Sequence, residues 1–245
     1  MKQCIGFLLF TAMGWLACTP NNVKSDANIE KILDSAQVKG CFALMDNASA
    51  QFVIANLSAY KDSAYAPLQT AFAVSTLIAL DKGIINHTPS TWAPLDSIAY
   101  YQQLMEQIGR PNVLKTIDSI HYGKGIVGSD LNRFWMDGSL RITPDEQLGF
   151  IKKLYFNQLP FQKRTQDIFK KMILKEDNAN YRLSYISGFD TTGFPTQWIL
   201  GYIEENKHPY FFVMHTTTSN KDGKLSNLSL LKSILAAQGF LKGVR

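Results

Sequence analysis

Cysteine and histidine are scarce in this chain of 245 residues, which has three cysteines and four histidines. Cys4 lies inside an N-terminal apolar segment and Cys18 directly follows it, so Cys41 alone remains in the part expected to fold and no intramolecular disulfide can form there. Cys41 belongs to an apolar run, which predicts a buried thiol and not a nucleophile. None of the spacings typical of zinc ligands joins the histidines, which are His87, His121, His208 and His215. We therefore predict neither a metal site nor a cofactor.

Charge is also sparse and evenly spread. Charged residues make up 18% of the chain, with 25 basic and 20 acidic residues and a formal net charge of +5. Because the basic residues are scattered and not clustered along the sequence, the charge pattern argues against nucleic acid binding. The hydrophobic content of 46% is typical of a globular domain, and the length suits one domain, with two lobes as an alternative.

The first 17 residues have a charged start, an apolar core and a small-residue end. This pattern predicts a secretory signal that is too short for a membrane span. The end, Trp15-Leu16-Ala17-Cys18, is similar to a bacterial lipobox. It predicts an exported protein whose acylated Cys18 anchors it to a bacterial membrane, facing the periplasm or the cell surface. Residues 18–27 would form a tether and residues 28–245 the folded domain. A plain secretory signal with an incidental cysteine is the alternative.

Residues 64–83 are predicted to form a central, buried helix. Pro67 lies just ahead of the first turn, and Lys82 and Gly83 supply a basic last turn and a stop. The segment is apolar nearly all round, which is typical of a helix in the middle of a domain. Its polar residues before Asp81 are Gln69, Thr70, Ser75 and Thr76, and none of them ionises near neutral pH.

The remaining pattern predicts an α/β (α+β) fold with a central, mostly antiparallel sheet flanked by helices. Helical spacing occurs at residues 28–36, 97–108, 113–119, 148–155, 162–174 and 227–238. Strands are predicted at residues 40–45, 51–55, 181–188, 197–204 and 210–217. Thr143 and Glu146 have the spacing of a helix capping box.

The central stretch resembles, without a gap, the active-site helix of the class D β-lactamases and the related penicillin-recognising receptors. That family carries Tyr-x-Pro-x-Ser-Thr-Phe-Lys and, after a short spacer, Leu-Ile-x-Leu-(Asp/Glu)-x-Gly. The matching residues are Tyr65, Pro67, Thr70, Leu77, Ile78, Leu80, Asp81 and Gly83. Gln69 stands at the position of the nucleophilic serine, and Phe72 stands at the position of the lysine that acts as general base.

Other segments from about Glu30 onward are similar to the same family. The ungapped register places Asp96 at the serine of the second motif, Ser-x-Val, whereas a one-residue shift would place Ser97 there. Tyr122-Gly123-Lys124 matches Tyr-Gly-Asn except at its last residue. Trp135 belongs to a segment resembling Phe-Trp-Leu-Asp-Gly. In the third motif, Lys-(Thr/Ser)-Gly, Ile186 replaces the lysine, while Ser187 and Gly188 remain.

The resemblance implies a serine β-lactamase/transpeptidase fold with a helical lobe, but a degenerate active site. Nucleophile, base, second-motif hydroxyl and substrate-binding cation are replaced by Gln69, Phe72, Asp96 and Ile186. An amide is not a nucleophile and a phenyl ring cannot accept a proton. The sequence thus predicts a catalytically inactive binding or regulatory module of the bacterial envelope, whose partner is an envelope protein or a peptidoglycan-derived ligand. The residues expected to line its cleft are Thr70, Lys124, Trp135, Ser187 and Gly188.

Two alternatives stay open at this point. The first is an active serine hydrolase or β-lactamase of the same fold with a displaced nucleophile, such as Thr70 or Ser75. Neither residue has a base one turn further along the helix, and packing or hydrogen bonding to the backbone is the simpler interpretation of both. The second is a structural lipoprotein of the envelope.

Overall fold

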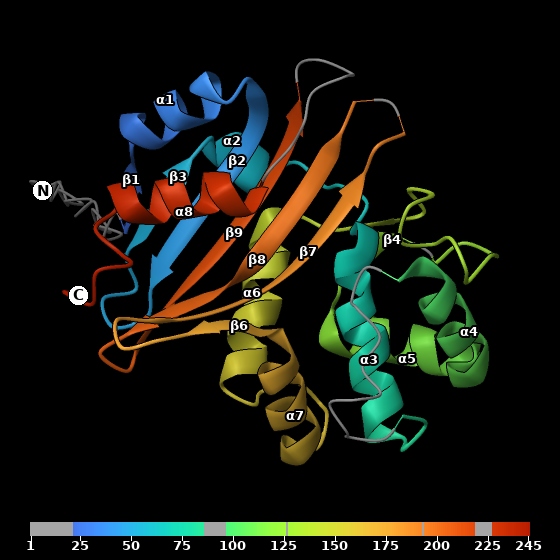
Figure 1. The fold of residues 1–245 in the computed structure, drawn as a ribbon. Helices are drawn as coiled ribbons and strands as arrows, with labels where there is room; N and C mark the ends of the chain where they lie inside the picture. The colour runs from blue at the N-terminus through green and yellow to red at the C-terminus, as the bar shows by residue number, and fades with distance from the viewer. Residues whose placement is uncertain (1–21, 86–96, 126, 193, 219–226) are drawn as a thin grey trace, which may run out of the picture.

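The computed structural model describes residues 22–85, 97–125, 127–192, 194–218 and 227–245 (Figure 1). Its main sheet has seven strands in the order β1-β3-β2-β9-β8-β7-β6. The strands are β1 (Val23–Ser25), β2 (Val38–Asp46), β3 (Phe52–Ala55), β6 (Leu174–Asp177), β7 (Arg182–Asp190), β8 (Thr196–Glu205) and β9 (His208–Thr218). Every neighbouring pair is antiparallel except β1 with β3, which is parallel. The predicted mostly antiparallel sheet is therefore confirmed.

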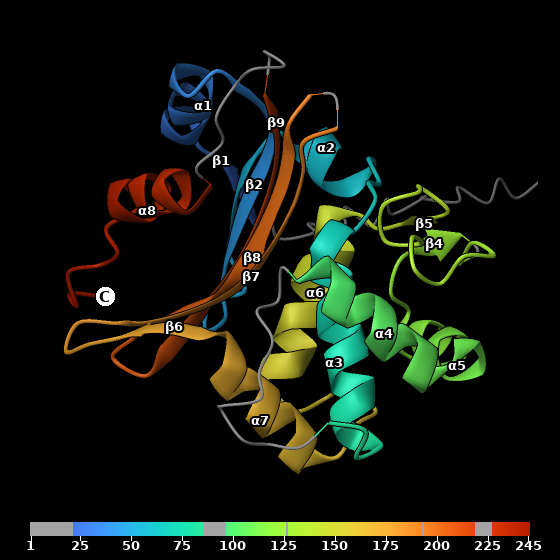
Figure 2. The same ribbon diagram turned by 45° about the vertical axis from the view of Figure 1, so that its right-hand side comes forward.

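Helices cover both faces of this sheet, as two views of the ribbon agree (Figures 1 and 2). The helices are α1 (Ala27–Ser35), α2 (Leu57–Lys61), α3 (Phe72–Asp81), α4 (Ile98–Ile108), α5 (Arg110–Ile120), α6 (Pro144–Tyr155), α7 (Lys163–Ile173) and α8 (Asn227–Ala237). Helices α1 and α8 lie on one face, and the others lie on the opposite face, where α3, α4 and α5 form the predicted helical lobe. A short ribbon of β4 (Lys124–Gly125) and β5 (Leu140–Arg141) lies beside that lobe.

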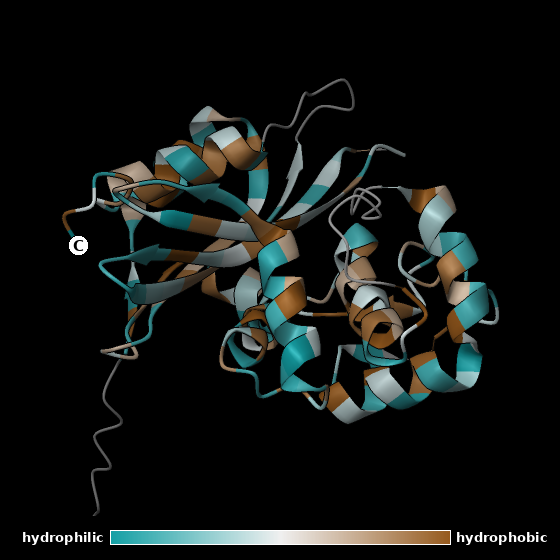
Figure 3. Cartoon of the chain, turned by 60° about the horizontal axis from the view of Figure 1, so that its bottom comes forward, coloured by the Kyte–Doolittle hydropathy of each residue, from teal (hydrophilic) through white to brown (hydrophobic). Residues whose placement is uncertain are grey.

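Each face of the sheet has its own hydrophobic core. The smaller core joins α1 and α8 to the sheet, and the larger one surrounds α3. Every residue of α3 from Phe72 to Leu80 is buried, as the apolar circumference of this segment predicts. The surface helices α6 and α7 instead combine hydrophobic and hydrophilic residues, and only one side of each is buried (Figure 3).

The start of the central helix differs from the prediction. The α-helix begins at Phe72, and a 3₁₀ turn, η1 (Leu68–Ala71), precedes it. Tyr65 is held in a β-bridge to Ile142, and Leu68 adopts a positive φ of 52°. Both features are incompatible with a continuous helix from residue 64. The turn places Gln69 and Thr70 at the N-terminal end of α3.

Residues 22–27, the described part of the expected tether, belong to the folded domain. Within them, Val23–Ser25 form β1, which pairs with β3, and Asp26 caps α1 by accepting a hydrogen bond from the Asn28 N–H. The fold therefore includes residues ahead of the predicted boundary at residue 28. Residues 1–17 and Cys18 lie outside the described residues. No helix within the described ranges is long and apolar enough to cross a membrane.

Candidate functional site

Gln69 is fixed where the η1 turn meets the open edge of β7. Its side chain is 7% exposed, and its Oε1 accepts a hydrogen bond from the Phe189 N–H at 2.6 Å. Gly188 permits this approach. A Cβ at residue 188 would lie 2.8 Å from the Gln69 nitrogen and 3.0 Å from the Thr70 nitrogen, which is too close for any other residue without displacement. The retained glycine thus lets the turn and the strand pack backbone against backbone.

This contact uses the donor that acyl transfer would need. An acyl-enzyme formed on residue 69 would place a carbonyl oxygen near its side chain, and backbone N–H groups stabilise the negative charge that develops on it. The Phe189 N–H is such a donor, and the amide oxygen of Gln69 already occupies it. The Phe189 N–H therefore already has an acceptor in the folded protein, and that acceptor comes from the side chain at the nucleophile position.

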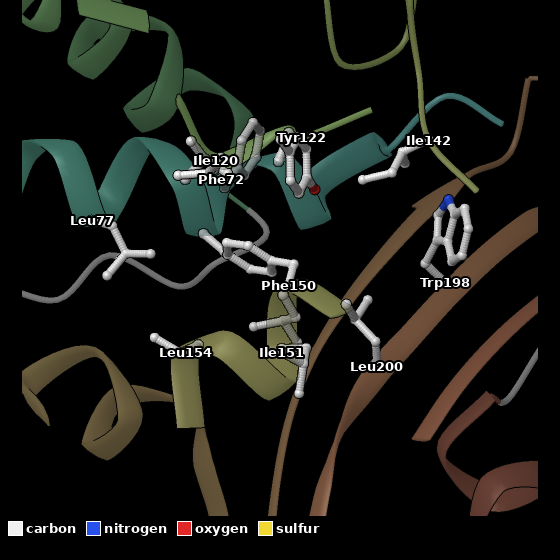
Figure 4. Close-up of a cluster of buried hydrophobic side chains, with 14 of the residues drawn as sticks. Phe72, Leu77, Ile120, Tyr122, Ile142, Phe150, Ile151, Leu154, Trp198 and Leu200 are labelled. Carbon is white, nitrogen blue, oxygen red and sulfur yellow. The ribbon is translucent and has the colours of Figure 1, made fainter. Parts of the chain in front are cut away.

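Phe72 occupies the position of the general base with an aromatic ring that is completely buried. It stacks on Tyr101 at a centroid distance of 4.0 Å and an interplanar angle of 11°, and it packs edge-on against Trp135 at 4.9 Å. Figure 4 shows the ring in the same buried cluster as Tyr122 and Phe150. Among the described residues, the indole Nε1 of Trp135 has no hydrogen-bond partner. An unused donor therefore remains in this core, where Phe72 supplies no acceptor.

Thr70 belongs to a buried polar network and not to an open site. Its hydroxyl donates to the Pro67 carbonyl and accepts from Gln147 Nε2 at 2.8 Å, and the Tyr122 hydroxyl lies 3.5 Å away. Thr70 and Gln147 are fully buried, and burial raises the pKa of Tyr122 above its usual value. Since the Thr70 hydroxyl already donates to a backbone carbonyl and cannot reach solvent, the geometry does not support it as a nucleophile.

Ser75 is similarly occupied. It is 1% exposed, and its hydroxyl donates to the Ala71 carbonyl at 3.4 Å. The interpretation of Thr70 and Ser75 as packed, backbone-bonded residues is thereby confirmed, and a displaced nucleophile has no support at either position.

The third motif also lacks its charge. Ile186 is 2% exposed and packs in the larger core, paired across β7 and β8 with Leu200. Ser187 is exposed, and Gly188 faces Gln69. A cation that could bind a substrate carboxylate is therefore replaced by core packing. Asp96, the fourth degenerate position, lies outside the described residues.

Lys124 does not lie where the sequence placed it. We expected it to line the cleft at Gln69, but it lines a cavity of about 510 Å³ beside α5, together with His121 and Glu146. Tyr122, two residues earlier, points to the Thr70 network. The expected set is thus divided: Thr70, Trp135 and Gly188 surround the degenerate centre, Ser187 is exposed beside it, and Lys124 belongs to a separate hollow. No group of histidine, cysteine, aspartate and glutamate side chains within the described residues could hold a metal ion.

His215 is a buried histidine beneath the site. It is 2% exposed, stacks on Tyr65 at a centroid distance of 3.7 Å and lies 4.4 Å from the Trp198 ring. Neither ring nitrogen has a partner in the part of the chain that the structure describes. Burial lowers the pKa of His215 to about 3. The histidine lies in β9, an interior strand of the sheet.

Sequence reasoning missed Phe189, whose backbone N–H holds Gln69, and Gln147, which holds Thr70. Phe189 directly follows the retained Gly188, so the motif itself was a signal for it. Gln147 carries no such signal, because it lies 77 residues from Thr70 and meets it only through the packing of α6.

Comparisons with known proteins identify the family of this chain. Residues 81–236 match the family described as penicillin binding protein transpeptidase domain. Beta-lactamase OXA-48 of Klebsiella pneumoniae is 28% identical over 71% of this chain and 74% of its own length. Beta-lactamase OXA-5 of Pseudomonas aeruginosa is 26% identical over 99% of this chain and 100% of its own. The regulatory protein BlaR1 of Bacillus licheniformis is 28% identical over 86% of this chain, but over only 39% of its own length.

Solved structures give the same result. The class D beta-lactamase YbXI from Nostoc superimposes with a TM-score of 0.78 at 25% identity, covering 87% of this chain and 99% of that one. The C-terminal domain of the Bacillus licheniformis BlaR penicillin receptor also gives 0.78, at 26% identity, covering 89% and 96%. The resemblance read from the sequence is therefore confirmed. The chain belongs to the penicillin binding protein transpeptidase domain family, and it is similar to the class D β-lactamases and to the penicillin receptors.

Proposed function

We propose that this protein is a catalytically silent member of its family that acts as a binding or regulatory module of the bacterial envelope. The observation that carries the proposal is the hydrogen bond between Gln69 Oε1 and the Phe189 N–H, because it fills the carbonyl position with a group that cannot be acylated. The buried ring of Phe72 supports it, since the base position holds no proton acceptor. An envelope protein or a peptidoglycan-derived ligand is the partner that the family relationship suggests.

Incubation with a fluorescent penicillin tests the silent chemistry. We expect the intact mass of the wild-type protein to stay unchanged and the band to stay dark after denaturing electrophoresis. The matched variant Gln69→Ser restores a hydroxyl at the family position, and we expect it to stay unlabelled as well, because Phe72 provides no base to activate it. A covalent adduct on the folded wild-type protein, absent after heat denaturation, would overturn the proposal. Thr70→Ala and Ser75→Ala would then locate the nucleophile.

The envelope location is a separate part of the proposal and rests on the lipobox-like end of the N-terminal segment. We expect the full chain, expressed in bacteria, to incorporate labelled fatty acid and to sediment with membranes. Cys18→Ser should abolish both, because the acyl chains attach at this residue. Cys41→Ser is the matched control and should change neither. Membrane sedimentation that persists unchanged in Cys18→Ser would refute the lipid anchor.

A further inference from the structure

The cavity that Lys124 lines has none of Gln69, Phe72 and Ile186 in its lining. It measures about 510 Å³, within the range of about 300–1,000 Å³ that small-molecule sites occupy. Leu114 and Ile117 contribute aliphatic walls from α5. Four ionisable side chains also line it, namely Asp118, His121, Lys124 and Glu146, and Gly123 and Val127 complete the lining. An apolar wall combined with a few charged groups is the usual composition of a site for a small ligand.

Local backbone geometry brings these residues together. Leu114, Ile117 and Asp118 have the i, i+3, i+4 spacing of one helix face. His121 ends α5 in the left-handed region, with φ 52° and ψ 50°. Gly123 then turns the chain at φ 77°, and a Cβ there would lie 2.4 Å from the Arg141 carbonyl oxygen. Only glycine permits this turn, which leads Lys124 into β4 and back beside α5.

The charged side chains around the cavity are of both signs, and among the described residues Lys124 and Asp118 form no ion pair. In the described ranges, no ion pair within 4.0 Å joins the ammonium of Lys124 to any carboxylate, and none involves Asp118. Glu146 uses its Oε2 in the capping box of α6, bonded to the Thr143 N–H at 2.8 Å. A ligand carboxylate could therefore meet Lys124, and a ligand ammonium could meet Asp118, with an aliphatic group between them.

We propose that this cavity binds a small zwitterion with an aliphatic side chain, either a free amino acid or the end of a short peptide. Its carboxylate lies against Lys124, its ammonium against Asp118, and its side chain against Leu114 and Ile117. The site goes beyond the proposed function and is independent of it, because no residue that lines the cavity takes part in the hydrogen bonds of Gln69 or Thr70. It also gives a role to the lysine that replaces the asparagine of the family motif.

Calorimetric titration of the folded protein with leucine and leucyl-leucine, at up to about 10 mM, tests the site. Two analogues are the matched ligands, because 4-methylpentanoate lacks the ammonium and isoamylamine lacks the carboxylate. We expect at least one zwitterion to bind at least about tenfold more tightly than either analogue, equivalent to about 1.4 kcal/mol. Absence of heat for both zwitterions, or equal binding of an analogue, would overturn the proposal.

Variants assign the contacts. Lys124→Gln and Asp118→Asn should each weaken zwitterion binding about tenfold or more, whereas Lys115→Gln, an exposed lysine on the same helix, should leave it unchanged. Thermal melting of each variant shows that the fold is retained. Gln69→Ala should also leave zwitterion binding unchanged, because residue 69 does not line the cavity. A failed titration would contradict only the zwitterion site, and a penicillin adduct would contradict only the proposed function. Binding that survives Lys124→Gln would contradict the proposed orientation.

Discussion

Replacing Phe72 by lysine, the residue that the family carries there, is expected to lower the free energy of unfolding by about 3–5 kcal/mol. The ring is completely buried and makes two aromatic contacts, with Tyr101 and Trp135, which the substitution removes. A lysine ammonium would also enter a core in which the unsatisfied Nε1 of Trp135, whose ring packs against Phe72, is a donor and cannot accept a hydrogen bond from it. Desolvation of this charge would therefore stay uncompensated.

Phe72→Leu is the matched control for this prediction. It removes the same aromatic contacts and leaves no charge, so we expect it to cost only about 1–2 kcal/mol. Urea unfolding followed by circular dichroism measures both variants against the wild type. If Phe72→Lys is no more destabilising than Phe72→Leu, residue 72 is hydrated or lies near a hydrogen-bond acceptor. The burial of Phe72 would then no longer support the proposal that the protein is catalytically silent. The expected difference also means that a lysine at residue 72 would lower the stability of this chain.

The sequence predicted the architecture well because helices and strands follow from the periodicity, turn residues and capping residues of short segments. Apart from the start of α3, period and turn residues placed the principal helices and strands within a few residues of their observed ends. The capping box of Thr143 and Glu146 has both of its hydrogen bonds. The short elements were missed. Helix α2 has five residues and follows Asn56, whose left-handed backbone and side-chain cap start it. Strand β6 has four residues, and the periodicity of α7 runs directly into it.

The degenerate positions were also predicted, but what their replacements do was not. The sequence shows a glutamine at residue 69, whereas its partner, the Phe189 N–H, lies 120 residues away and becomes visible only when η1 and β7 are packed together. For Phe72 the sequence shows the aromatic side chain, and the structure adds its stack on Tyr101 and its edge-on contact with Trp135. Lys124 lines the cavity beside α5 because the chain turns at Gly123, with a φ of 77°, and a motif alignment does not record such a turn.

The unpartnered imidazole of His215 predicts a marked acid sensitivity of the fold. Burial among Tyr65, Trp198 and the sheet lowers the pKa of this histidine to about 3, whereas the unfolded chain binds a proton near pH 6.5. Below pH 6.5 the unfolded state thus gains a proton that the folded state excludes. The stability that depends on a neutral His215 is present above pH 6.5 and decreases as the pH falls toward 3.

Between pH 7.5 and 4.5 we expect this residue alone to lower the free energy of unfolding by about 2–3 kcal/mol, at about 1.4 kcal/mol per unit below pH 6.5. Urea unfolding at several pH values in that window measures how the free energy of unfolding depends on pH. The window ends at pH 4.5, above the usual pKa values of aspartate and glutamate. His215→Phe keeps a flat ring in the stack without an ionisable group and should remove this dependence, whereas His121→Gln, which removes an exposed histidine, should retain it. Equal slopes for the wild type and His215→Phe would show that the imidazole is protonated in the folded state. If the slope is lost as expected, acid weakens the support beneath Tyr65, from which the chain continues into the turn that holds Gln69 against Phe189.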